Sequence, residues 1–217
     1  MMYLPIHRTL VTAVAAAALA LAGCSEGAAF GDADARASEG MADAEGAPTG
    51  VVDSIFPIQE EIRRFKLTVD GDAERLTGGA ESREALVSGF VSALERLDTA
   101  ALARGVIDRA EFIDLYFPGT VYVEPPYEMD PAIIWFQMTN NSSRGITRAF
   151  RRLGGRSLAY GGHSCASSPR VEGHNRIWER CVVRIAPDGG EEIELRLFGL
   201  ILERDGRFKF VTYGNEL

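Results

Sequence analysis

The stretch that decides the fold is residues 82–102, SREALVSGFVSALERLDTAAL. Its large apolar residues recur at three- and four-residue intervals, which predicts one apolar face of a helix: Leu86, Val87, Phe90, Val91, Leu94 and Leu97. Ser82 is a suitable N-cap for this helix. Asp98 or Thr99 then begins a short second helix that runs to Arg104. The segment therefore predicts two consecutive helices joined by an elbow.

Helix signals also occur on both sides of this segment. Ser54 and Pro57 precede apolar residues at helical spacing. Asp108 with Glu111 matches a capping box, and Asp130 before Pro131 matches a cap followed by proline at the first helical position. The polar residues 140–143 interrupt the next apolar pattern, so a separate helix is expected over residues 143–153.

The last third of the chain is typical of strands. Residues 157–164, 176–185, 192–203 and 207–213 are expected to be strands. Residues 187–190 (PDGG) and 205–206 (DG) are hairpin turns. Helices followed by an antiparallel meander predict an α+β fold, with the N-terminal helices packed on a C-terminal sheet.

The elbow of residues 82–102 and the strands that follow resemble the nuclear transport factor 2-like, or SnoaL-like, superfamily. This resemblance covers residues 50–217 and implies a cone-like domain, in which a curved antiparallel sheet wraps around helices and leaves a pocket. The long helical middle, residues 108–153, departs from the family pattern. The family includes isomerases, cyclases, dehydratases and non-catalytic binding modules, so the fold alone does not choose among them.

Aromatic residues are the candidates to line such a pocket around a small apolar ligand. Together with one histidine, the candidate set is Tyr116, Tyr122, Trp135, Tyr160, His163, Trp178, Phe198 and Tyr213. Plain packing in the hydrophobic core is the alternative for each of them. No family residue for proton transfer can be placed in this sequence, so no catalytic residue is assigned.

Residues 1–23 are expected to be a signal peptide, because a short basic start is followed by an apolar run that is too short to span a membrane. The run ends in Leu21-Ala22-Gly23-Cys24, which resembles the lipobox of bacterial lipoproteins. That resemblance implies cleavage before Cys24 and transfer of a diacylglyceryl group to its sulfur, so that the mature protein carries acyl chains such as palmitate. The alternative is an ordinary signal peptide cleaved after Ala20-Leu21-Ala22, with Cys24 left as a free thiol.

Residues 24–49 are expected to be a lipidated cysteine followed by a disordered acidic tether, since the segment is rich in Ala and Gly and has six acids against one base. Residues 50–217 are nearly balanced in charge, and no basic footprint for nucleic acid is present. The expected location is the bacterial cell envelope. Ser25 after the cysteine favours the outer membrane facing the periplasm, by the sorting habit of such lipoproteins.

Cys165 and Cys181 form an even pair on successive predicted strands, which favours a disulfide in an oxidising compartment. A Cys2His2 metal site with His163 and His174 is an alternative, but the spacing matches no common zinc pattern. Two separate free thiols are the other alternative. No cofactor motif is found, so neither a cofactor nor a metal is expected.

Four arginines at helical intervals, Arg144, Arg148, Arg151 and Arg152, could face an anionic surface or an acidic partner, or could simply be solvated. The expected function is a non-catalytic, membrane-anchored lipoprotein that binds a small apolar molecule or an envelope protein. An isomerase or cyclase acting in the pocket and an envelope assembly factor are the alternatives.

Overall fold

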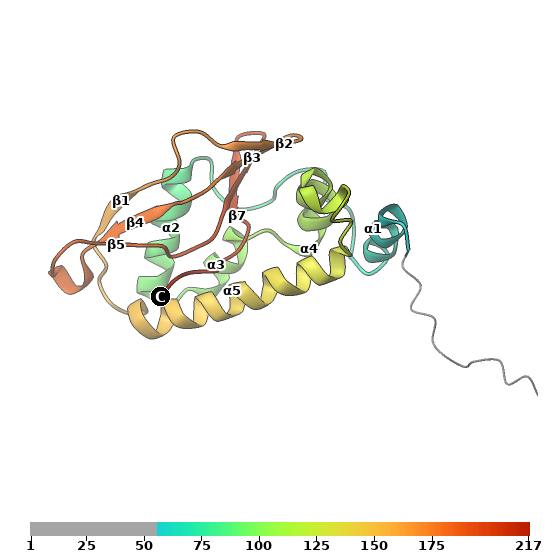
Figure 1. Cartoon of the computed structure of the whole chain (residues 1–217). Helices are drawn as coiled ribbons and strands as arrows, with labels where there is room; N and C mark the ends of the chain where they lie inside the picture. The colour runs from blue at the N-terminus through green and yellow to red at the C-terminus, as the bar shows by residue number, and fades with distance from the viewer. Residues whose placement is uncertain (1–55) are drawn as a thin grey trace, which may run out of the picture. The chain divides into compact units, whose positions relative to one another are not determined.

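The predicted elbow is formed by α2 (Arg83–Arg96) and α3 (Thr99–Gly105) (Figure 1). The computed structural model describes residues 56–217, so the predicted signal peptide, lipobox and tether lie outside the described residues. The Ser82 hydroxyl accepts a hydrogen bond from the Ala85 amide, and Asp98 caps α3 through the Ala101 amide. Leu97 adopts a left-handed conformation with φ of 54°, which turns the chain between the two helices.

The other helical segments precede the sheet, apart from one turn. They are α1 (Ile58–Lys66), α4 (Arg109–Glu111), a π-helical turn (Phe112–Tyr116), 3-10 turns at Phe117–Gly119, Val121–Val123 and Pro187–Gly189, and α5 (Pro131–Leu153). The predicted capping box is confirmed, since the Asp108 and Glu111 side chains accept hydrogen bonds from each other's amides. The predicted cap at Asp130 is also confirmed, through the Ala132 amide.

The predicted helix break at residues 140–143 is wrong, because α5 is one continuous helix of 23 residues. The C-terminal segment contacts this part of the helix. The Ser142 hydroxyl accepts a hydrogen bond from the Tyr213 amide at 3.1 Å, and the Asn215 side-chain amide donates to the Gly145 carbonyl at 2.8 Å. Tertiary contacts therefore stabilise a helical segment whose local sequence disfavours a helix.

The strands form two antiparallel sheets. Their bounds are β1 (Tyr160–Ser164), β2 (Arg170–Glu172), β3 (Asn175–Trp178), β4 (Val182–Ile185), β5 (Ile193–Leu195), β6 (Ile201–Arg204) and β7 (Arg207–Phe210). One sheet has the order β1-β4-β5 and the other β2-β3-β6-β7. The predicted strands 176–185 and 192–203 are thus each divided between the two sheets. Arg180, with φ of 52°, lies at the first division.

The larger sheet is covered on both faces, because adjacent residues of β6 enter different cores. Ile201 and Phe210 pack with α2 and α3 in the first core. Leu202 and Ile177 pack with α1 and the π-helical turn in the second core. The α+β class predicted from the sequence is confirmed, with helices preceding an antiparallel sheet region.

A buried ion pair lies on the face of the larger sheet that packs in the second core. The Lys209 ammonium lies 2.6 Å from the Glu111 carboxylate, and the two side chains are 3% and 1% exposed. Lys209 also donates to the Thr77 carbonyl, and Glu111 accepts from the Thr77 amide at 2.6 Å. Both charges are therefore hydrogen-bonded where water cannot reach them.

Within residues 56–217, no helix combines the length and the apolar character that crossing a membrane would require.

Candidate functional site

An apolar hollow lies between α3 and α5, and we call it the α3–α5 groove. It has a volume of about 350 Å³. Its apolar wall is formed by Ala103, Val106, Ile107, Trp135, Met138 and Val211. Volumes of this size are at the lower end of those that hold small molecules.

A second hollow of about 230 Å³ extends this groove along α5. Ala103, Ser142 and Ser143 line both hollows. The extension is closed by Leu102, Ile146 and Tyr213. The two hollows together offer an elongated apolar surface with hydroxyl groups along one side.

Arg109 is at the opposite end of the groove, at the first position of α4. Its guanidinium donates to the Thr68 hydroxyl at 2.7 Å and lies 4.5 Å from the centre of the Phe65 ring. Its Nε atom is buried and has no hydrogen-bond partner among the described residues. No acidic side chain of residues 56–217 forms an ion pair with Arg109, and the exposed Asp108 beside it also lines the groove.

Another hollow, of about 230 Å³, lies on the other side of α3 against α2 and β7. Glycine and alanine form much of its wall, including Gly89, Ala93 and Gly105, and Arg96 and Arg104 stand beside it. Both arginines are exposed to solvent. The buried Tyr213 hydroxyl also lines it but already donates to the Leu102 carbonyl. Because none of the lining residues has a buried polar atom without a partner, the α3–α5 groove is the better candidate site.

The predicted pocket residues do not surround one hollow. Tyr116, Tyr122 and Trp135 belong to the second core, whereas Tyr160, Trp178, Phe198 and Tyr213 belong to the first. Among them, Trp135 lines the groove and Tyr213 lines its extension. The others serve mainly in packing, and burial raises the pKa of Tyr116 to about 12.

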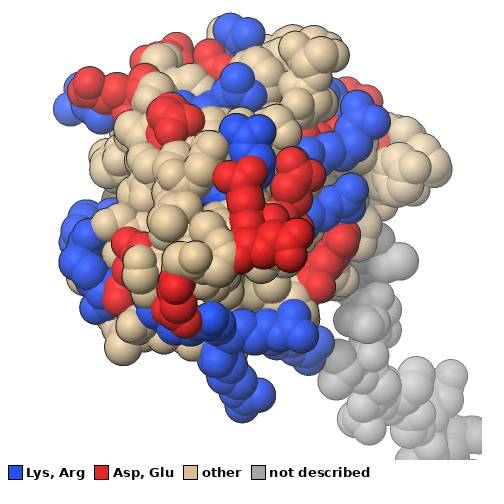
Figure 2. All heavy atoms as spheres, turned by 90° about the vertical axis from the view of Figure 1, so that its left-hand side faces the viewer, with Lys and Arg blue, Asp and Glu red and all other residues tan. Residues whose placement is uncertain are grey.

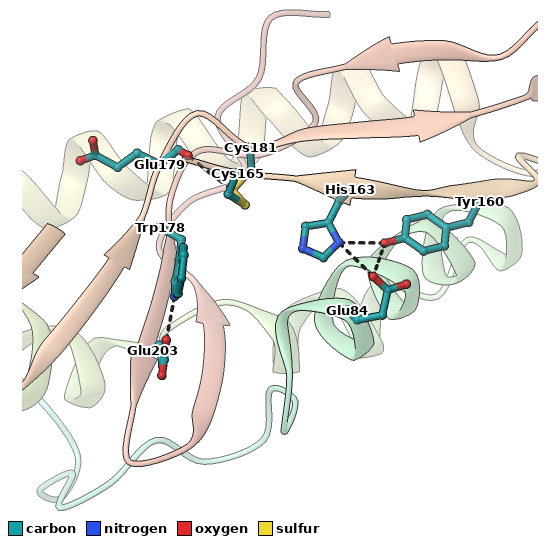
Figure 3. The surroundings of a disulfide bond; sticks show 8 residues. All are labelled: Glu84, Tyr160, His163, Cys165, Trp178, Glu179, Cys181 and Glu203. Atoms are coloured by element: carbon teal, nitrogen blue, oxygen red, sulfur yellow. Dashed lines mark hydrogen bonds and ion pairs between the residues drawn. A yellow bond between two sulfur atoms is a disulfide. The ribbon is translucent and has the colours of Figure 1, made fainter. Parts of the chain in front are cut away.

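Tyr160 and His163 on β1 meet Glu84 at the start of α2 (Figure 3). The Tyr160 hydroxyl lies 3.0 Å from His163 Nδ1 and 3.2 Å from the Glu84 carboxylate, and Nδ1 is 3.2 Å from the same carboxylate. Because a carboxylate only accepts hydrogen bonds, this geometry favours a proton on Nδ1. Burial lowers the pKa of His163, while the Glu84 carboxylate opposes that shift. Burial and the same carboxylate raise the pKa of Tyr160.

This cluster has the groups needed for proton transfer, since a neutral imidazole with a free Nε2 can act as a base. In Figure 3 the second ring nitrogen of His163 points away from Tyr160 and Glu84. However, the hollows described in residues 56–217 are lined by other residues. Without a hollow for a substrate, the arrangement is better explained as a link between α2 and β1.

The cysteine prediction is confirmed, because Cys165 and Cys181 are joined in a disulfide (Figure 3). Cys165 follows β1, and Cys181 lies between β3 and β4, where the two sheets divide. The alternatives of a Cys2His2 site and of free thiols are therefore wrong. Among the described residues, no group of three or more His, Cys, Asp or Glu side chains is arranged to hold a metal ion.

The four predicted arginines all lie on α5. Arg144, Arg151 and Arg152 are exposed and form no ion pair with residues 56–217. Arg148 is half-buried and donates two hydrogen bonds to Asn215, at 3.0 Å to its side-chain oxygen and at 2.9 Å to its carbonyl. Figure 2 shows basic side chains along the lower edge of the face that it presents, where the C-terminal end of α5 lies in Figure 1.

The groove itself could not be predicted from the sequence. Val106, Met138 and Val211 are ordinary apolar residues, and they meet only because α3, α5 and the segment after β7 converge. Arg109 lies inside the predicted capping box of residues 108–111. That position could have indicated that a cation lies next to an apolar patch. It could not have shown that the Nε atom of Arg109 is buried. The chain matches no protein-family model, and neither curated proteins nor solved structures give a significant match.

Proposed function

We propose that this protein is a lipid-anchored envelope lipoprotein whose folded domain binds a small amphipathic molecule without transforming it. The ligand class has an apolar body and one anionic group. The body would lie along the α3–α5 groove, and the anion would reach Arg109. The anchor and the envelope location rest on the sequence of residues 1–49.

The observation that carries the ligand proposal is the positive charge at one end of an apolar groove. Arg109 has a buried Nε atom without a partner, and the adjoining wall includes Trp135 and Val211. A guanidinium N–H group that lacks an acceptor gains a charge-assisted hydrogen bond when an anion binds. Removal of apolar ligand surface from water supplies the remaining stabilisation.

A nuclear transport factor 2-like domain is the finer fold that we propose. The elbow of α2 and α3 packs on the sheet region, and successive strands change sheets at residues 179–181. Both features agree with a bent sheet around helices. The second helical layer, formed by α1, α4 and the π-helical turn, departs from that pattern, and Arg109 of α4 lines the candidate groove.

The ligand proposal can be tested with two fluorescent probes of similar shape. 1-Anilinonaphthalene-8-sulfonate carries an anion, and N-phenyl-1-naphthylamine does not. In Arg109→Gln we expect about tenfold weaker binding of the sulfonate, because a charge-assisted hydrogen bond is lost, and unchanged binding of the amine. Arg75→Gln, an exposed arginine outside the groove, is the matched control. Equal affinity of wild type and Arg109→Gln for the sulfonate would remove the proposed role of Arg109.

A blocking variant tests the position of the apolar body. Ala103 is exposed and lines both hollows, so Ala103→Trp should fill them without crowding the core and should abolish binding of both probes. Ala100→Trp, exposed on the same helix, should bind them normally. If both tryptophan variants bind the probes like wild type, the groove is not the site.

The anchor is tested separately, by cell fractionation and partition into detergent. Wild-type protein should enter the detergent phase, and Cys24→Ser should remain in the aqueous phase, because several acyl chains are needed for firm membrane attachment. Detergent partition of Cys24→Ser equal to that of wild type would refute lipidation at this cysteine. Either outcome leaves the probe-binding result unaffected.

A further inference from the structure

The outward face of α5 combines exposed apolar and basic side chains. Ile133 is 48% exposed and Phe136 is 65% exposed near the N-terminal end of the helix. Arg144, Arg148 and Arg151 follow on the same side, since intervals of three, four and seven residues bring side chains to one helix face. The result is one stripe along the helix, with two exposed apolar residues in its first half and three arginines in its second.

The stripe lacks opposing charge. No Asp or Glu occurs anywhere in α5. Among the described residues, no acidic side chain forms an ion pair with Arg144, Arg151 or Arg152. The folded domain has more acids than bases overall, so the positive charge of α5 is a local feature and not a consequence of net charge.

The basic half also contains a shallow hollow of about 340 Å³. It is lined by Arg144, Arg148, Arg151, Ser143 and Thr147. Guanidinium groups and hydroxyls are the side chains that commonly bind phosphate oxygens. Arg148 is held in place by its two hydrogen bonds to Asn215, which reduces the entropy lost on binding an anion.

We propose that this face of α5 binds the anionic headgroups of a phospholipid surface. The arginines contact phosphate groups, and Ile133 and Phe136 enter the boundary between headgroups and acyl chains. A protruding helix with apolar residues and arginines on one face suits a planar lipid surface, whereas an acidic protein partner would leave the exposed Ile133 and Phe136 unexplained. The proposal depends on neither the groove ligand nor the lipid anchor.

Vesicle flotation tests this proposal with the chain from Ser25 onward, which carries no anchor. This chain retains both cores, because each is built from residues 58–217. We expect it to bind phosphatidylcholine vesicles that contain about one-third phosphatidylglycerol, and to bind pure phosphatidylcholine at least tenfold more weakly. Added salt should weaken binding to the anionic vesicles.

The key variant is Arg144→Gln/Arg151→Gln/Arg152→Gln, which removes exposed arginines only. A basic residue near an anionic surface contributes roughly a fivefold gain in binding, so the triple variant should lose at least tenfold. The matched control, Arg75→Gln/Arg104→Gln/Arg180→Gln, removes the same charge from exposed positions outside α5 and should bind like wild type. Phe136→Ser should lose severalfold at high salt, where the apolar contact dominates.

Three results would overturn the proposal. One is equal binding to anionic and neutral vesicles. Another is an equal loss in the two triple variants, which would indicate a general effect of net charge. The third is release from the vesicles by inorganic phosphate at an ionic strength at which chloride releases nothing, because that result would make free phosphate the ligand.

Discussion

At the scale of single residues, the distinctive feature of this protein is how it places charge inside the fold. Glu111 is part of a helix cap and also the partner of Lys209. Arg109, two residues earlier, is close by in the chain but has an unpartnered Nε. One short segment therefore supplies both a buried, hydrogen-bonded charge pair and a guanidinium with an unpartnered Nε atom.

Breaking the buried pair should be costly. Lys209→Met should lower the free energy of unfolding by about 3–5 kcal/mol, because it leaves the Glu111 carboxylate buried without its counter-charge. The double variant Lys209→Met/Glu111→Gln should lose less than Lys209→Met alone. The control variant Lys66→Met removes an ammonium that is 45% exposed and pairs with Asp114. This change should lower the free energy of unfolding by about 1 kcal/mol or less. Urea unfolding measures all three, and a double variant that is no more stable than Lys209→Met would contradict this account.

His163 should make stability depend on pH. Burial lowers the pKa of His163 in the folded protein, whereas in the unfolded chain the pKa is about 6.5. Below about pH 6.5 the unfolded state binds the proton first, so the free energy of unfolding falls as pH falls, by at most about 1.4 kcal/mol per pH unit. His163→Asn should remove this part of the dependence between about pH 7 and 5, while His174→Asn, at an exposed position, should keep it. Parallel stability profiles for wild type and His163→Asn would contradict the assignment.

At the scale of elements, α5 shows how tertiary contacts override local preference. The asparagines and serines in its middle favour turns in isolation, yet the helix continues through them to Leu153. The C-terminal segment crosses the helix at Gly145, where a side-chain methyl group would overlap the Tyr213 carbonyl oxygen. The absence of a side chain at Gly145 is what permits this close approach.

Two glycine-to-alanine changes in helices should therefore have opposite effects. Gly145→Ala should destabilise the protein by about 3 kcal/mol through overpacking. Gly89→Ala in α2 has no atom within 4 Å of the added methyl group and should stabilise it by up to about 1 kcal/mol through helix propensity. Thermal unfolding compares them directly. A Gly145→Ala variant as stable as wild type would show that the C-terminal segment does not pack on α5 as described.

At the scale of the whole molecule, the larger sheet joins the two cores. Its strands contribute alternate residues to the core on each face, as Ile201 and Leu202 do. The disulfide between Cys165 and Cys181 then ties the segments where the chain passes from one sheet to the other. Because the cores share strands, we expect them to unfold together.

Removing the disulfide should lower the stability of both cores equally. Cys165→Ser/Cys181→Ser should reduce the free energy of unfolding by about 3 kcal/mol, by the loop-entropy estimate. Trp135 reports on the second core and Trp178 on the first, so Trp178→Phe and Trp135→Phe backgrounds separate the two signals. Different urea midpoints for the two tryptophans would mean that the cores unfold independently.

The sequence by itself determined the features that depend on neighbouring residues in the chain. These are the elbow of α2 and α3, the caps at Asp108 and Asp130, and the hairpins β4–β5 and β6–β7, because spacing, capping and turn residues are local properties. The predicted single meander is wrong, since the strands form two sheets in which β1 pairs with β4 and β3 with β6. The pairing of Cys165 with Cys181 was also predictable, from the even number of cysteines left after Cys24 and their positions on successive strands.

The continuity of α5, the division of the strands between two sheets and the candidate groove depend on contacts between distant segments, so no local pattern predicts them. The predicted aromatic residues separated into two cores, because adjacent residues of a strand face opposite sides of the sheet and a sequence cannot state that both sides are covered. The groove also depends on contacts between segments that are distant in the chain. Ala103, Trp135 and Val211 are far apart in the chain, and they line one hollow only because their three segments pack side by side.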